Sequence, residues 1–144
     1  MTVMRLFIFG FALVFILISC DKDDNKNGGT SCDEQVIINN ELYENAPNDE
    51  LTFVSIEIIE DCLKIKFTSS GCDGSSWEVK LIASEDIAES FPPQRFLRLS
   101  LKNEEVCDAV ITKEISFGIT ELRTDGNQLL LNISDWEDPL LYEY

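Results

Sequence analysis

The chain is 144 residues long and acidic, with 27 Asp and Glu against 11 Lys and Arg, a formal net charge of -16 and no histidine. A surface this negative repels phosphate backbones, which excludes nucleic acid as a partner. The lack of histidine excludes Ser–His and Cys–His nucleophilic sites and removes the commonest metal ligand.

The first 19 residues have the pattern of a bacterial secretion signal. Arg5 precedes the uncharged apolar run Leu6–Ile18, which at 13 residues is shorter than the roughly 20 needed to span a bilayer. The run ends in Leu17-Ile18-Ser19-Cys20, which resembles the lipobox of bacterial lipoproteins. That resemblance implies cleavage before Cys20, diacylglycerol and N-acyl lipid on Cys20, and a membrane as its partner.

Residues 20–31 are expected to form a flexible acidic tether, because Asp21–Ser31 contains no apolar residue and two adjacent glycines. Its start, Cys20-Asp21-Lys22-Asp23-Asp24, resembles the lipoprotein export signal of Bacteroidota. The resemblance implies an outer-membrane lipoprotein exposed at the cell surface. The alternative is a solvated linker that carries no export signal.

A two-residue hydrophobic period dominates residues 32–144 and predicts half-buried strands. Turn residues such as Asp125-Gly126-Asn127 and Asp138-Pro139 separate them. We therefore expect a single all-β domain, an antiparallel, immunoglobulin-like β-sandwich of seven or eight strands, with a small barrel as the alternative. Ser84–Ser90 is the one helical candidate. The inward residues of the expected strands are Val36 to Ile38; Val54, Ile56 and Ile58; Leu63, Ile65 and Phe67; Trp77, Val79 and Leu81; Leu97, Leu99 and Leu101; Ile115, Phe117 and Ile119; Leu129, Leu131 and Ile133; and Leu140, Tyr142 and Tyr144.

Four cysteines remain once Cys20 is set aside, an even number in a secreted context where disulfides persist. An extended strand after Cys62 carries the chain too far for Cys62 to pair with Cys72. Alternating strand directions bring the loops of Cys72 and Cys107 to one end, which leaves Cys32 for Cys62. We expect these two disulfides to stabilise the fold. A four-cysteine zinc site is the alternative, but the spacing lacks a C-x-x-C pair.

The sequence favours a non-catalytic envelope module that binds a protein or a glycan, or serves as a structural component. Phe96 lies on the polar face of its strand and Trp136 in an acidic loop, so either could mark a binding surface. We expect no cofactor besides the lipid, no metal and no catalytic residues. Calcium on loop carboxylates and a small carboxylate-dependent, for example glycan-directed, hydrolase are the alternatives.

Residues 50 to 144 also resemble a set of small uncharacterised bacterial lipoprotein domains. The resemblance rests on Cys62-Leu63-Lys64-Ile65, Ser70-Gly71-Cys72, Pro92-Pro93-Gln94 and the closing Leu140–Tyr144. It implies no known activity.

Overall fold

The computed structural model describes residues 31–144. The signal peptide, Cys20 and nearly all of the tether lie outside these residues, so the expectations for them stay predictions. No helix in the described part is long and apolar enough to cross a membrane. In chain order the elements are β1 (Glu34–Gln35), β2 (Ile37–Ile38), α1 (Asn40–Asn45), β3 (Thr52–Ile59), β4 (Cys62–Gly71), β5 (Glu78–Ala88), β6 (Gln94–Lys102), β7 (Ala109–Gly118), the 3₁₀ turn η1 (Thr120–Leu122), β8 (Gln128–Ile133) and β9 (Leu140–Glu143).

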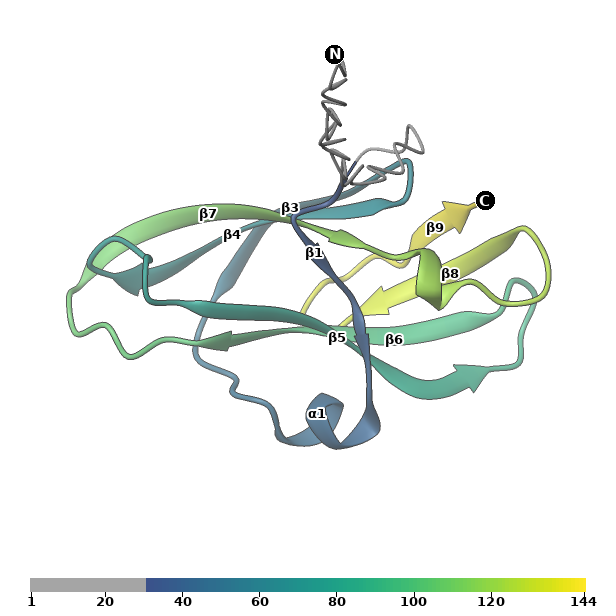
Figure 1. The fold of residues 1–144 in the computed structure, drawn as a ribbon, viewed down its shortest axis with the longest axis horizontal. Coiled ribbons are helices and arrows are strands. Elements are labelled where there is room, and N and C mark those ends of the chain that lie inside the picture. The colour runs from purple at the N-terminus through teal and green to yellow at the C-terminus, as the bar shows by residue number, and fades with distance from the viewer. Residues whose placement is uncertain (1–30) are drawn as a thin grey trace, which may run out of the picture.

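The strands form two sheets, in the orders β1-β7-β4-β3 and β2-β5-β6-β8-β9 (Figure 1). Each contributes one apolar face to a shared core, as the alternating sequence requires. In β4 and β6, for example, Leu63, Ile65, Phe67, Leu97 and Leu101 are fully buried. The expectation of a mostly β protein with its core between strands is therefore confirmed.

Both sheets are mixed, so the expectation of purely antiparallel pairing is wrong. Three pairs, β1 with β7, β2 with β5 and β6 with β8, are parallel. β1 and β2 belong to different sheets, and Val36 between them is buried in the core. The chain also changes sheets between β7 and β8. A two-residue hydrophobic period indicates which face of a strand is buried, but not which strand pairs with it. Neither sheet closes as a barrel would, and this topology does not establish the expected immunoglobulin-like arrangement.

The predicted helix at Ser84–Ser90 is also wrong, because β5 continues to Ala88. Its pairing with β6 is irregular between Ala83 and Ile87, which breaks the two-residue period that identifies a strand. The true helix is α1. Asn39 caps it by accepting a hydrogen bond from the Leu42 N–H at 2.7 Å.

A bulge also shifts the pattern of β3. The pairing with β4 is irregular between Phe53 and Ser55, so Phe53 packs against the core whereas Val54 is 51% exposed. Simple alternation had placed Val54 inside. The bulge turns the Phe53 ring toward the loop that follows β8, where the candidate site lies.

Candidate binding surface

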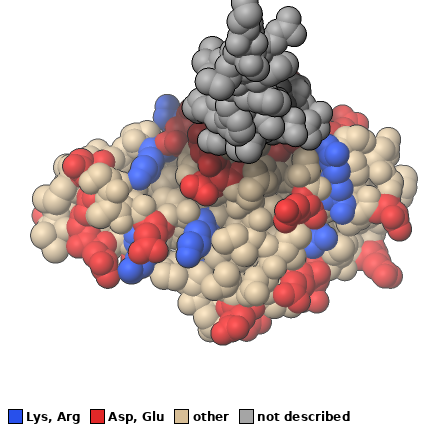
Figure 2. All heavy atoms as spheres, in the orientation of Figure 1, with Lys and Arg blue, Asp and Glu red and all other residues tan. Residues whose placement is uncertain are grey.

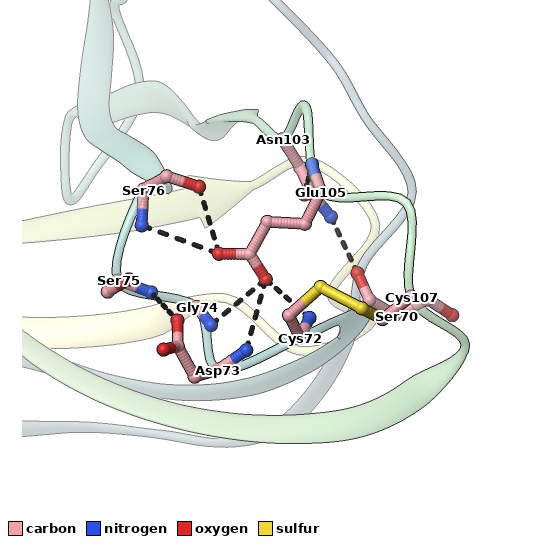
Figure 3. Close-up of a disulfide and its surroundings, with 9 residues drawn as sticks. All are labelled: Ser70, Cys72, Asp73, Gly74, Ser75, Ser76, Asn103, Glu105 and Cys107. Atoms are coloured by element: carbon pink, nitrogen blue, oxygen red, sulfur yellow. Dashed lines mark hydrogen bonds between the residues drawn. A yellow bond between two sulfur atoms is a disulfide. The ribbon is translucent and has the colours of Figure 1, made fainter.

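Both disulfides favoured by the strand directions are present. Cys32 and Cys62 lie with their Cα atoms 5.7 Å apart, and Cys72 and Cys107 with theirs 4.9 Å apart. The second joins the β4–β5 loop to the β6–β7 loop at one end of the two sheets (Figure 3). With all four cysteines paired, a zinc site built from them is excluded.

Beside this disulfide, the Glu105 carboxylate is held by the β4–β5 loop. One oxygen accepts hydrogen bonds from the N–H groups of Cys72, Asp73 and Gly74, at 2.6, 3.2 and 3.1 Å. The other accepts one from the Ser76 hydroxyl at 2.9 Å (Figure 3). Gly74 has φ +72°, which lets successive N–H groups converge on the carboxylate. The two loops therefore remain joined by polar contacts as well as by sulfur.

The hydrogen bonds to Glu105 also lower its pKa. Desolvation acts to raise the pKa, but the hydrogen bonds from Gly74, Cys72, Ser76 and Asp73 outweigh it and lower the pKa to about 2. Glu105 is thus a fixed anion whose oxygens are already engaged, and we assign it a structural role.

Residues of β4, β6 and the β6–β7 loop anchor the segment that enters β3. The Asn103 N–H donates to the Asp49 carboxylate at 2.6 Å, and the Ser69 hydroxyl donates to the Glu50 carbonyl at 2.7 Å. Asp49 also donates its N–H to the Leu101 carbonyl at 3.0 Å. These bonds fix residues 48–51 across the end of both sheets.

Residues 48–53 border three adjoining cavities with shared lining residues. The one next to the β8–β9 loop has a volume of about 380 Å³. Its apolar surface comes from Leu51, Phe53 and Trp136, and we call it the Trp136 groove. Its full lining is Leu51, Thr52, Phe53, Asp135, Trp136, Glu137 and Asp138.

The two aromatic rings of the Trp136 groove lie nearly perpendicular, at 80°, with their centroids 6.1 Å apart. Asp135 adopts φ +65°, and the Trp136 N–H donates to the Ile133 carbonyl at 3.1 Å. This tight turn holds the half-buried Trp136 against Phe53. Trp136, which the sequence indicates as an aromatic residue in an acidic loop, lines this cavity, and its binding role stays a prediction.

The rim of the groove is acidic. Asp135, Glu137 and Asp138 are exposed, and no Lys or Arg lines this cavity. Acidic side chains also outnumber basic ones on the face of the molecule that Figure 2 shows. A ligand in the groove would therefore meet an apolar aromatic floor within a negative field.

Phe96, the other predicted binding residue, does not line the Trp136 groove. It is 38% exposed on the outer face of β6, where alternation places Leu130 and Leu141 on neighbouring strands of the same face. The two aromatic candidates therefore belong to separate surfaces. The sequence did not indicate that Phe53 faces the groove, because a two-residue hydrophobic period does not reveal the bulge between Phe53 and Ser55.

The clearly shifted pKa values of the carboxyl groups in the described residues all change in one direction. Within residues 31–144, every carboxyl group with a clearly shifted pKa has it lowered, through hydrogen bonds, whereas a general acid needs a raised one. In the same range no group of three or more Cys, Asp or Glu is arranged to hold a metal ion.

Comparison with known proteins identifies one similar fold. No family model matches the chain, and no curated protein matches it. A crystal structure of a protein of unknown function, DUF1344, from Bacteroides vulgatus ATCC 8482 is similar, with a TM-score of 0.53 and 17% sequence identity. The match covers 77% of this chain and 56% of that one, so this chain spans little more than half of its structural neighbour. At this identity the likeness concerns the fold alone.

Proposed function

We propose that this protein is a lipid-anchored lipoprotein of the outer membrane, exposed at the cell surface, whose domain is a non-catalytic binding module. The lipobox supports the lipid anchor, and the acidic segment after Cys20 supports localisation at the cell surface. The Trp136 groove supports the binding role.

One observation carries the binding proposal. Trp136 is held half-exposed at the edge of a cavity, by a turn with a left-handed Asp135, and not sealed in the core. Aromatic side chains that keep one face open are frequent anchors of binding sites. Leu51, at the end of the fixed segment 48–51, and the ring of Phe53 give the groove a preformed wall, which reduces the ordering cost of binding.

The binding role can be tested with envelope fractions from the source cells. The full-length protein, purified in detergent and immobilised, should retain a protein or glycan component that a Trp136→Ala variant does not retain. Phe96→Ala is the matched control, because it removes an exposed aromatic ring outside the groove. Equal retention by the native protein and Trp136→Ala would refute a binding role for the groove.

The anchor has its own test. Cells that express the protein should incorporate labelled palmitate into it, and Cys20→Ala should abolish both labelling and precursor cleavage. Cys20 is the suitable target because the other four cysteines form disulfides. Normal labelling of Cys20→Ala would show that the lipoprotein assignment is wrong.

A further inference from the structure

The identity of the ligand follows from the charges around the Trp136 groove. The side chains of Asp135, Glu137 and Asp138, which line the groove, are exposed, and none has an ion pair or hydrogen bond to another residue of the described chain. The basic side chains that form ion pairs, those of Lys64, Lys102 and Arg123, face other carboxylates. Three carboxylates without a basic partner along one groove favour a cationic ligand.

One arginine, Arg98, lines the adjoining cavity but is already engaged. Its guanidinium donates to the carbonyl groups of Ala46 at 2.6 Å and Leu42 at 3.2 Å, and to the Asn48 side chain at 3.3 Å. Arg98 thus secures the end of α1 and the start of segment 48–51. It bonds only neutral acceptors and so keeps its charge, but it does not line the Trp136 groove.

The rings of Phe53 and Trp136 favour an organic cation as the ligand. Phe53 and Trp136 offer apolar ring surface for an alkyl stem, and a π face attracts an ammonium or guanidinium group. Neither ring has an oxygen ligand for a hard metal ion, so a bare metal ion gains little from Phe53 and Trp136. A lysine or arginine side chain meets both requirements.

The neighbouring backbone indicates that this side chain belongs to an extended polypeptide. β3 is the last strand of its sheet and, within residues 31–144, pairs only with β4. Val54 and Ile59 on β3 are 51% and 43% exposed, so the side chains at this edge of the sheet are also open to solvent. The first residues of β3, Thr52 and Phe53, line the groove. A strand added to this edge would carry alternate side chains into the groove.

We propose that the Trp136 groove binds an extended, lysine- or arginine-bearing segment of another polypeptide, which pairs with the free edge of β3 and places a basic side chain against Phe53 and Trp136. This inference rests on the proposed binding function and names the ligand class of the same site.

Calorimetry on the full-length protein in detergent tests the proposal with three probes. These are an end-blocked ten-residue peptide of alternating lysine and valine, its counterpart with glutamate in place of lysine, and a neutral β-glucan hexasaccharide. We expect only the lysine peptide to bind. Methylating alternate backbone nitrogens of that peptide should weaken binding by about tenfold or more, because it removes the donors that pair with β3.

Matched variants locate the binding. Trp136→Ala should weaken binding of the lysine peptide by about tenfold. The triple variant Asp135→Asn, Glu137→Gln, Asp138→Asn should weaken it at least as much, as expected when charge pairs are lost. The control triple variant Glu41→Gln, Glu44→Gln, Glu89→Gln makes the same change in net charge at exposed positions outside the groove, and should leave affinity within about twofold.

The outcomes separate the two proposals. Binding of the hexasaccharide but not of the lysine peptide, with loss in Trp136→Ala, would overturn the basic-segment inference and leave the binding function standing. Equal losses in the two triple variants would overturn it as well, because attraction would then be non-specific. Unchanged binding of the N-methylated peptide would refute pairing with β3. No binding of the lysine peptide, together with unchanged envelope retention by Trp136→Ala, would refute both proposals.

Discussion

Two side chains with shifted pKa values hold the sheets together at their two ends. Tyr142 is fully buried, and its hydroxyl donates to Asp61 at 2.6 Å, so the last strand is bonded to the β3–β4 turn. Burial and the Asp61 carboxylate together raise the pKa of Tyr142 to about 12. The same hydrogen bond, more than the nearby Arg123, lowers the pKa of Asp61. At the other end, Glu105 holds the disulfide-bonded loops.

Replacing Tyr142 by Phe should cost about 2 kcal/mol of unfolding free energy, since the ring still fills its site but the hydroxyl's hydrogen bonds to Asp61 and from Arg123 are lost. Asp61 is partly exposed, so water can replace the phenol there. Urea denaturation of the native protein and Tyr142→Phe measures this difference. Tyr43→Phe is the control, because Tyr43 lies on α1 and donates no side-chain hydrogen bond within the described chain. An equal effect of both substitutions would contradict the assigned role of Tyr142.

Glu105 predicts a pH dependence of stability. Its folded-state pKa of about 2 lies below the ordinary value of 4.5, so the ionised form stabilises the fold above pH 4.5 and this contribution is lost as the pH falls toward 2. Glu105→Gln should therefore melt at a lower temperature than the native protein near neutral pH, and the gap should narrow between pH 4.5 and 2. Thermal melts at several pH values measure the gap. A constant gap would show that the carboxylate charge contributes nothing.

The second disulfide links elements that the strand directions alone bring together. Cys72 and Cys107 are 35 residues apart in sequence, and closing a loop of that length stabilises a fold by about 4 kcal/mol in the chain-entropy description. The double variant Cys72→Ala, Cys107→Ala should lose about that amount in denaturant unfolding. Glu105 and Asn103 should still hold the two loops in place, so the variant should fold. A loss below about 1 kcal/mol would mean that these contacts already restrict the unfolded chain.

At the scale of elements, the sequence predicts faces well and neighbours poorly. Alternation correctly identified the buried residues of β4, β6 and β8, and strand direction led to both cysteine pairs. The parallel pairs could not be predicted, because they depend on where the chain changes sheets. Two residues of the sequence do indicate α1. Asn39 is a typical N-cap residue, and Pro47 follows the end of the helix.

The candidate site was predictable only in part, because it depends on a strand irregularity that a local sequence pattern does not indicate. Trp136 stands out because it is an aromatic residue among acidic ones. Its partner Phe53 is turned inward by a bulge that leaves Val54 exposed, and no local pattern encodes that shift. Glu105 is one of 27 acidic residues, and only the loop geometry distinguishes it.

For the whole molecule, the net charge of -16 sets the character of any binding. Attraction of a basic segment to exposed carboxylates is screened over about 10 Å at 0.1 M salt. Binding of the lysine–valine peptide should therefore weaken several-fold between about 0.05 and 0.5 M salt, mainly through slower association. Stopped-flow measurements of the association rate over that range would test this. Salt-independent association would contradict an electrostatic role for the groove rim.

The account centres on the Trp136 groove as the binding surface, and chemical-shift mapping with the lysine–valine peptide tests it most directly. The protein contains two tryptophans, and Trp77 is buried against Phe67, so its indole N–H is an internal reference. We predict the largest shifts at residues 51–53 and 135–138, including the Trp136 indole, with the Trp77 indole unchanged. Shifts centred on Phe96, Leu130 and Leu141, or no shifts in the groove, would contradict the account.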